Sequence, residues 1–274
     1  MGKLVSRLAG RLGNQMFEIA GTATLAKRQG FEFDGAWLDV PDTEYSVDRQ
    51  SEYIYNTVLR KVPMRDRKYL AENNYRFDYP FGNYNLYLQH GYEWPQYKGN
   101  TIVQSFLQDS KMIDIEIAYD LFGTYDSIKQ EINDVYGDLS DYVCIHVRRG
   151  DYLSNECRMC GFNVLTKEQI DDILKIHFPL NRVIFVSDDL DWCKENFKGD
   201  RYVFADRDCK NHTEMDLYIQ TQCGGNIISN STFSWWGAYL NPNSKVVVPY
   251  PWFSNAPWGN HEQIYCENWI KYQI

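Results

Sequence analysis

The chain has 274 residues, a length that fits one large domain or two domains of ordinary size. Hydrophobic residues make up 44% and charged residues 24%, as in an ordinary globular protein, and no apolar run reaches the roughly 20 residues of a membrane span. The net charge of −9 argues against a general nucleic-acid binder, which needs a basic face.

The cysteine content argues against a disulfide framework. Seven cysteines, an odd number, all fall at or after Cys144. Cys157 and Cys160 form a single CxxC with no second pair at zinc spacing, so free thiols are expected. We therefore expect a cytoplasmic protein, and peripheral contact with the inner face of a membrane stays open.

The first residues predict a strand that leads into a helix. Lys3–Leu8 is the expected strand, a glycine-bearing turn follows at Ala9–Asn14, and apolar residues at helical spacing run from Met16 to Ala26, before Gly30 ends the helix. A strand, a glycine turn and a helix start can cradle an anion or a nucleotide, but a turn without a ligand explains them equally well.

The next stretch, residues 31–98, follows no clean period and is rich in aromatic side chains, most of them at residues 75–97. Such rings stack on sugar faces, although ordinary packing explains them more often. Beyond this stretch, Ile102–Leu107 predicts a strand, and a helix falls within Lys111–Val135.

The second half alternates strands and helices. The expected strands are Tyr142–Val147, Arg182–Ser187, Arg201–Ala205, Asn226–Ser229 and Lys245–Pro249. The helix between the first two strands begins with a capping box of Thr166 and Gln169. This alternation predicts a parallel sheet with right-handed crossovers. We expect an α/β fold of two Rossmann-like domains, residues 1–138 and 139–274, which face a central cleft.

Polar clusters follow three of these strands, at Arg148–Asp151, Ser187–Asp189 and Asn230–Ser234. Ligands of open α/β sheets bind beyond the carboxyl ends of the strands, so the three clusters can surround one ligand. Two adjacent arginines suit a phosphate, and the hydroxyls at a helix start suit one as well. Aspartates suit a base edge or a ribose. A solvated charged turn and simple helix caps are the plainer explanations.

A metal site is the rival interpretation of two Asp-x-Asp segments, Asp189-Leu190-Asp191 and Asp206-Arg207-Asp208. Such a segment after a strand can hold a divalent ion on a nucleotide-sugar diphosphate. Because the arginine pair already supplies positive charge for a diphosphate, we expect no metal.

Several segments, in order along nearly the whole chain, resemble the α-1,2-fucosyltransferase family. They are Arg11–Phe17, His146–Tyr152, Phe185–Asp189 with Trp192, and Asn230–Ala238. Ser105–Ile113 is similar to a degenerate copy of a further family segment and keeps Gln108 and Lys111. Arg11 stands where the family usually carries a second glycine, a departure that bears on the choice of acceptor.

The resemblance implies a glycosyltransferase of the GT-B type. Such an enzyme would transfer L-fucose from GDP-fucose to the 2-hydroxyl of a galactoside with inversion, and it would need no cofactor. The acceptor would be a galactose-containing oligosaccharide or a lipid-linked glycan of O-antigen or capsule-like biosynthesis. Residues 1–138 would lie on the acceptor side, and residues 139–274 would bind the GDP-sugar.

The resemblance also implies roles for single residues. Arg148 would contact the β-phosphate of the donor, Asp188 would lie near the guanine, and the Thr-Phe-Ser turn would lie near the diphosphate. The full expected donor-binding set is His146, Arg149, Ser187, Asp188, Asn230, Ser231, Thr232, Phe233 and Ser234.

Three side chains are expected on the acceptor or the fucose: Asn14, Gln15 and Gln108. Asp151 is the carboxylate nearest to the arginines, so it is either the catalytic base or the group that orients them. Glu18 and Asp188 are weaker candidates for the base.

Two other functions stay open. One is an inverting transferase that uses a different nucleotide sugar. The other is a non-catalytic glycan-binding module, which the 16% aromatic content would suit but which leaves Arg148–Asp151 unexplained.

Overall fold

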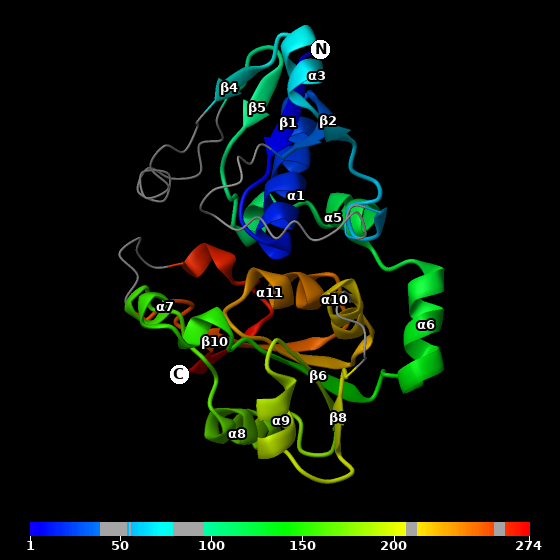
Figure 1. The fold of residues 1–274 in the computed structure, drawn as a ribbon, viewed down its shortest axis with the longest axis vertical. Helices are drawn as coiled ribbons and strands as arrows, with labels where there is room; N and C mark the ends of the chain where they lie inside the picture. The colour runs from blue at the N-terminus through cyan, green and yellow to red at the C-terminus, as the bar shows by residue number, and fades with distance from the viewer. Residues whose placement is uncertain (39–53, 55, 79–95, 207–212, 255–260) are drawn as a thin grey trace. The chain divides into compact units, whose positions relative to one another are not determined.

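The computed structural model describes residues 1–38, 54, 56–78, 96–206, 213–254 and 261–274. The chain divides into two compact units, Met1–Gly123 and Thr124–Ile274, and each is built around a parallel sheet (Figure 1). The predicted α/β class with parallel sheets is confirmed. The aromatic positions from Tyr79 to Trp94 lie outside the described residues.

The sheet of the first unit has the strand order β3-β2-β1-β5-β4. Its strands are β1 (Lys3–Arg7), β2 (Glu32–Trp37), β3 (Met64–Arg65), β4 (Arg76–Asp78) and β5 (Thr101–Val103). Its helices are α1 (Leu12–Gln29), α3 (Arg67–Glu72), the short η1 (Ser110–Met112) and α5 (Ile115–Phe122).

Helix α1 is the central helix of the first unit. Its side chains are buried on almost every face from Leu12 to Ala26, and Leu25 packs with Leu4 and Val103 of the sheet. Gly30 ends the helix as predicted, with φ of 71° in the left-handed region and its N–H directed at the last carbonyls. The predicted βα unit at the start of the chain is therefore confirmed.

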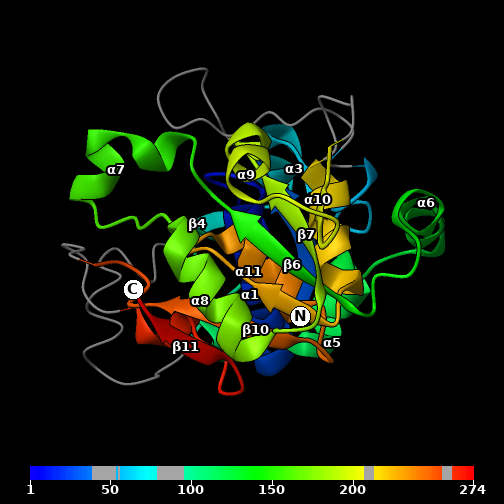
Figure 2. The same cartoon turned by 90° about the horizontal axis from the view of Figure 1, so that it is seen from below.

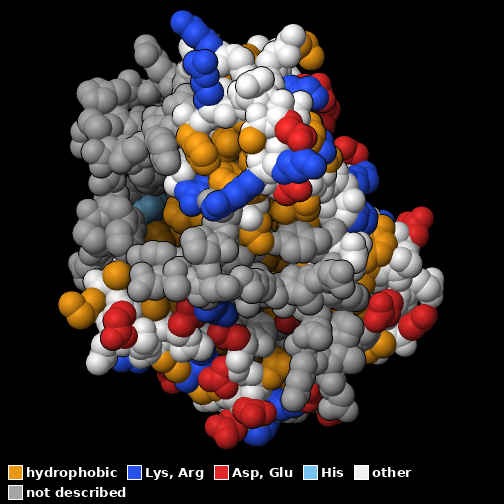
Figure 3. Space-filling view, turned by 45° about the horizontal axis from the view of Figure 1, so that its top comes forward, with side chains coloured by type: hydrophobic (Ala, Val, Ile, Leu, Met, Phe, Trp, Pro, Cys, Tyr) orange, Lys and Arg blue, Asp and Glu red, His pale blue; other side chains and the backbone are white. Residues whose placement is uncertain are grey.

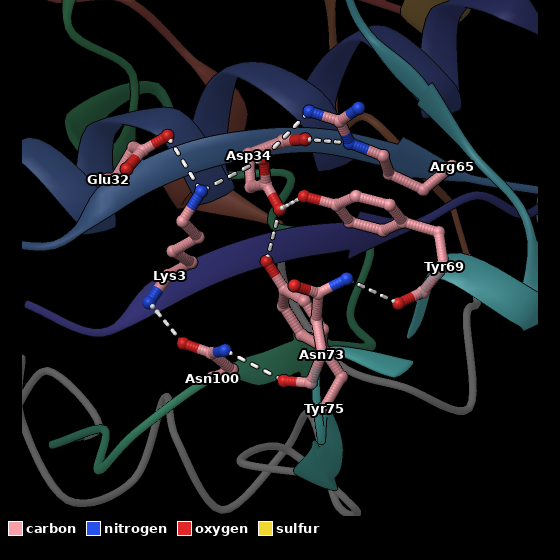
Figure 4. A network of polar contacts seen from close by, with 8 residues as sticks. All are labelled: Lys3, Glu32, Asp34, Arg65, Tyr69, Asn73, Tyr75 and Asn100. Atoms are coloured by element: carbon pink, nitrogen blue, oxygen red, sulfur yellow. Dashed lines mark hydrogen bonds and ion pairs between the residues drawn. The ribbon is translucent and has the colours of Figure 1, made fainter. Parts of the chain in front are cut away.

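Strand β2 was not predicted, and a buried charge explains why. The register of β1 on β2 skips one residue, so Asp34 forms a bulge. Asp34 is 3% exposed and accepts hydrogen bonds from the Tyr69 hydroxyl (2.7 Å), the Tyr75 hydroxyl and Arg65 Nη2 (2.7 Å) (Figure 4). The acidic and glycine residues that hide the strand in the sequence are thus held by partners distant in the chain.

The sheet of the second unit has the strand order β11-β10-β9-β6-β7-β8. Its strands are β6 (Tyr142–Val147), β7 (Arg182–Ser187), β8 (Tyr202–Phe204), β9 (Gly225–Ile227), β10 (Lys245–Tyr250) and β11 (Ile270–Gln273). Its helices are α6 (Asp126–Tyr136), η2 (Asp151–Leu153), α7 (Asn155–Met159), α8 (Lys167–His177), α9 (Leu190–Asn196), α10 (Thr213–Gln222), α11 (Thr232–Tyr239) and η3 (Glu262–Ile264).

Helices cover both faces of this second sheet. Side chains of α8 and α9 pack on the face that carries Val143, Ile145 and Val147. Helices α10 and α11 pack against each other on the opposite side (Figure 1). The view from below shows β6 running through the middle of the sheet beside β7 (Figure 2). The end of β6 is therefore surrounded by neighbouring strand ends.

The division between the units falls before α6, whereas the sequence placed it near residue 138. Helix α6 packs on α10 of the second unit. The rings of Tyr125 and Tyr218 lie 5.8 Å apart, and the hydroxyls of Thr124 and Thr221 are 2.9 Å apart. These contacts are not visible in the periodicity of the helix alone.

The charged side chains on the described surface are of both signs, as the composition indicates. Acidic and basic side chains are interspersed among the described residues of the face drawn in Figure 3. Among the described helices, none combines the length and apolar character that a membrane crossing requires.

Candidate functional site

Strand β6 carries Arg148 and Arg149 to the carboxyl edge of the second sheet. All six residues of β6 are buried, and the strand is paired with β7 on one side and β9 on the other. Val147 is in register with Ser187, so the ends of β6 and β7 lie side by side. Buried hydrogen-bonded strands on both sides give the two arginines a rigid support.

Arg148 lies between two carboxylates. Its Nη2 is 2.5 Å from Asp151 Oδ1, and its Nη1 is 2.8 Å from Asp188 Oδ2. Burial acts to lower the pKa of Arg148, but the bond to Asp151 and the charge of Asp188 raise it overall. The guanidinium, 18% exposed, therefore stays charged and forked at the sheet edge.

Arg149 is held by a different set of groups. Its Nε donates to Asp189 Oδ2 at 2.8 Å, and its guanidinium lies 4.4 Å from the ring centre of Trp192. The hydrogen bond from Arg149 holds the pKa of Asp189 below its ordinary value. The Arg149 backbone N–H donates to Asp188 Oδ1 at 2.8 Å.

The Ser187–Asp189 loop acts as a support for the arginines. Ser187 Oγ donates to the Val147 carbonyl at 2.7 Å and accepts from the Asp189 N–H at 2.9 Å. Asp189 caps α9 by accepting from the Trp192 N–H at 3.2 Å. The capping explanation is thus found at Asp189, while the Asp188 carboxylate contacts the arginines.

His146 belongs to a buried polar group beneath the edge. Its Nδ1 is 2.6 Å from Ser229 Oγ, and its ring centre is 5.5 Å from that of Phe233. Burial lowers the pKa of His146 to about 4, against the attraction of Asp188, so the imidazole is neutral at neutral pH. Ser229 was missing from the predicted set, because it reads as the last residue of a strand.

The third loop places a helix start at the same edge of the sheet. Ser231 is the N-cap of α11, yet its side chain makes no capping hydrogen bond, and the first turn holds no acidic residue. Ser231, Thr232 and Phe233 are half-buried, whereas Ser234 is buried and donates to backbone carbonyls. The backbone N–H groups of this turn can receive an anion.

Asn230 has a structural place in this loop. It is 2% exposed, its Nδ2 donates to the Trp252 carbonyl at 2.9 Å, and its own carbonyl accepts from the Tyr152 hydroxyl at 3.1 Å. Burial raises the pKa of Tyr152, so this phenol remains a hydrogen-bond donor. The bond joins the loop after β6 to the loop after β9.

The predicted acceptor-side residues of the first unit cluster at the start of α1. Gln108 Nε2 donates to Asn14 Oδ1 at 3.0 Å, and Gln15 Nε2 donates to the Gly10 carbonyl at 3.0 Å. Gly10 has φ of 68°, and a Cβ there would lie 2.5 Å from Asn14 Nδ2. The structure therefore brings Asn14, Gln15 and Gln108 together around one tight turn.

Glu18 fixes the same turn from below. It is 2% exposed, and its Oε2 accepts the Ala9 N–H at 2.8 Å. Burial raises the pKa of its carboxyl well above the ordinary value, although the Ala9 bond and the charge of Arg7 oppose the shift.

A further carboxyl, on α10, was not predicted from the sequence. Burial, with a smaller contribution from Glu214, raises the pKa of Asp216 to about 7. Acidic residues are ordinary in the first turn of a helix, so nothing in the sequence distinguished Asp216 from a surface acid.

The two Asp-x-Asp segments of the rival metal interpretation are described only in part. No group of three or more His, Cys, Asp or Glu side chains among the described residues is placed to hold a metal. Asp189 is engaged with Arg149, and Asp206 is paired with Lys194. Arg207 and Asp208 lie outside the described residues.

Paired arginines and a helix start at the carboxyl edge of a parallel sheet suit the phosphates of a nucleotide ligand. The family model of glycosyl transferase family 11 matches residues 2–273, so the chain belongs to that family. The resemblance to the α-1,2-fucosyltransferase family is thereby confirmed.

Three relatives illustrate the range of this family. The O-antigen biosynthesis glycosyltransferase WbnK of Escherichia coli is 26% identical, covering 98% of this chain and 100% of the relative. An alpha-1,2-colitosyltransferase of Escherichia coli is 27% identical, with 99% of each chain covered. Galactoside alpha-(1,2)-fucosyltransferase 2 of Sus scrofa is 25% identical, covering 87% of this chain and 70% of that protein.

Solved structures share the fold. The fucosyltransferase NodZ from Bradyrhizobium superposes with a TM-score of 0.52 at 16% identity, covering 88% of this chain and 94% of that one. NodZ, described as an alpha-1,6-fucosyltransferase, was also co-crystallized with GDP, and that structure superposes with a TM-score of 0.52 at 14% identity.

Proposed function

We propose that this glycosyltransferase transfers L-fucose from GDP-fucose to the 2-hydroxyl of a galactoside, with inversion and without a metal ion. The product would be a cell-surface glycan of the O-antigen or capsule type. The relatives support the proposal, since one is a galactoside fucosyltransferase and another acts in O-antigen biosynthesis. The structural neighbour NodZ was crystallized with GDP.

The single observation that carries the proposal is the forked guanidinium of Arg148 at the end of β6. Breaking the bond between fucose and the β-phosphate leaves negative charge on that phosphate. A donor held in place for this charge typically contributes about 3–4 kcal/mol to lowering the barrier. Arg148, whose side chain is 18% exposed and paired with two carboxylates, would provide such a donor.

The remaining contacts with GDP-fucose would come from the same carboxyl edge of the second sheet. Ser231, Thr232 and the N–H groups of the first turn of α11 would hold the diphosphate, with Phe233 and His146 beside them. Arg149, Ser187 and Asp188 would complete the site, and Asn230 and Ser234 would keep the turn in shape.

The two parallel-sheet units support assignment to the GT-B class, with the first unit on the acceptor side. Asn14, Gln15 and Gln108 would hold acceptor or fucose hydroxyls. Asp151 would orient Arg148, because its carboxylate is directed at that guanidinium. A lipid-linked acceptor at the cytoplasmic face of a membrane suits a relative that acts in O-antigen biosynthesis.

A second candidate donor is GDP-colitose, because an alpha-1,2-colitosyltransferase is 27% identical over nearly the whole chain. Colitose differs from fucose by the loss of the 3-hydroxyl. A site built to hydrogen-bond a substrate hydroxyl rejects the deoxy analogue by about 10⁴-fold, whereas an apolar site rejects an added hydroxyl only weakly.

The test is a transfer assay with GDP-fucose, GDP-colitose and UDP-galactose on a panel of galactosides, with and without EDTA. We expect turnover with GDP-fucose that EDTA does not reduce, and NMR of the product should show a new α-1,2 linkage. Transfer from GDP-colitose but not from GDP-fucose would show that GDP-colitose is the donor. Glycan binding without turnover of any of these nucleotide sugars would favour a non-catalytic glycan-binding module.

A further inference from the structure

The loop after β6 is wrapped around one carboxylate, that of Asp188. Its Oδ2 is 2.8 Å from Arg148 Nη1, and its Oδ1 accepts the Arg149 backbone N–H at 2.8 Å. A Cβ added to Gly150 would lie 2.5 Å from Asp188 Oδ2. Three consecutive residues of the loop thus approach the same carboxylate. Arg148 does so with its side chain, Arg149 with its backbone N–H and Gly150 with its Cα.

The position of Asp188 is itself fixed by the sheet. The ends of β6 and β7 are in register at Val147 and Ser187, and the Ser187 hydroxyl bonds to the Val147 carbonyl at 2.7 Å. Asp188 follows directly and is 25% exposed at its side chain. It therefore transmits the position of a rigid strand to a guanidinium carried by a loop.

Asp151 also contacts Arg148, but its place is different. It lies three residues further along the same loop, and its side chain is 42% exposed. A group that moves with the loop cannot fix the loop against the sheet. Asp188, which comes from the neighbouring strand, can do so.

We propose that Asp188 is a positioning residue, which sets the guanidinium of Arg148 for the leaving phosphate, rather than a residue that binds the guanine. This inference rests on the proposed function for its catalytic readout. It assigns Gly150 a role as well, because any side chain there would displace the Asp188 carboxylate from Arg148.

The first test compares Asp188→Asn with Asp191→Asn, a matched removal of one charge from an exposed aspartate of the following helix. Loss of a group that orients a functional side chain typically costs 10- to 100-fold. We expect kcat to fall by about that factor in Asp188→Asn and KM for the donor to change little, because the orientation counts most in the transition state. Asp191→Asn should keep the wild-type kcat.

A double-mutant cycle shows whether Asp188 acts through Arg148. In an Arg148→Lys background, Asp188→Asn should lower kcat by no more than about twofold further, since the group that it positions is already gone. Gly150→Ala should reproduce the loss of Asp188→Asn without any change of charge. Multiplicative losses in the cycle, or an Asp188→Asn variant within twofold of wild type, would overturn the inference.

A binding measurement separates this inference from the proposed reaction. The β-phosphate of GDP carries the negative charge that forms when fucose leaves, so calorimetry of GDP against GMP reports the placement of Arg148 without any transfer, even where KM for the intact donor changes little. We expect Asp188→Asn to reduce the preference for GDP to that of Arg148→Lys, with thermal melts confirming the fold. If the wild type prefers another nucleotide, the diphosphate and monophosphate of that base serve. A preference unchanged in Asp188→Asn refutes the positioning role, whereas a wild type that binds but transfers no fucose refutes only the reaction.

Discussion

At the scale of single residues, the chemistry depends on the fork of Arg148. Its two terminal nitrogens reach two different carboxylates, so both are aimed by the protein. An ammonium on a flexible chain cannot reproduce two directed donors. We expect Arg148→Ala to lower kcat by about 100-fold or more, and Arg148→Lys to recover little of the loss. Near-wild-type turnover of the lysine variant, with an unchanged circular dichroism spectrum, would remove this role from Arg148.

The second residue-scale prediction concerns Asp151. Asp151 Oδ1 is 2.5 Å from the Arg148 guanidinium, so we expect Asp151 to act through Arg148 and not as the proton acceptor for the sugar hydroxyl. We expect Asp151→Asn to lose no more than about tenfold in kcat and to keep the acidic limb of its pH–rate profile. Disappearance of that limb in the variant would assign proton transfer to Asp151.

At the scale of helices and strands, α10 and α11 are the elements whose packing supports the third loop. A Cβ on Gly237 of α11 would lie 2.6 Å from Cβ and Cδ of Gln220 on α10. Overpacking of this kind costs about 1–3 kcal/mol, so Gly237→Ala should lower the free energy of unfolding by that amount. Urea denaturation measures the change.

The control for this prediction is a rescue. In a Gln220→Gly background both opposing atoms, Cβ and Cδ, are gone, so Gly237→Ala should cost much less than it does alone. Equal costs in the two backgrounds would show that the contact between the helices is not what makes Gly237 necessary.

The same scale shows what the sequence can predict. The bounds of β6 and β7, the capping box of Thr166 and Gln169 and the end of α1 at Gly30 all follow from local patterns, and the structure has them as predicted. Strand β2 does not, because the partners of Asp34 are 31 to 41 residues away in the chain.

The candidate site likewise has features that the sequence predicts and others that it does not. Strand ends locate Arg148, Ser187 and Ser231 at one edge, because parallel strands end together. Which carboxylate meets which guanidinium depends on side-chain positions across two strands, so the contact of Asp188 with Arg148 was not predicted from the sequence.

At the scale of the whole molecule, the two units carry opposite contributions to the pH dependence of stability. In the first unit, burial acts to raise the pKa of Asp34, but the bonds from Tyr75 and Tyr69 and the charges of Arg65 and Lys3 lower it overall. Its contribution is present above the unfolded pKa of about 3.9 and is lost as the pH falls through the lowered folded value.

Asp34→Asn tests this contribution. The change leaves Arg65 and Lys3 without their buried counter-charge, so we expect a loss of about 2–3 kcal/mol in the free energy of unfolding at pH 7. The loss should shrink below pH 3, because there the wild-type carboxylate takes up a proton on unfolding and contributes less to stability. Glu32→Gln, at an exposed partner of Lys3, is the matched control and should cost less than about 1 kcal/mol.

The second unit has the reverse sign at Asp216. Its pKa of about 7 is raised by burial, so the folded state holds a proton that the unfolded state releases between about pH 4 and pH 7. The contribution of Asp216 to stability is therefore fully present below pH 4 and is lost as the pH rises toward 7. Asp216→Asn removes the titration and should stabilise the protein at pH 8 by about 2–4 kcal/mol, with little change at pH 4. Thermal melts of both proteins across this range measure the difference, and a shift in melting temperature that is the same at pH 4 and pH 8 would show that the Asp216 carboxyl is not protonated in the folded state near neutral pH.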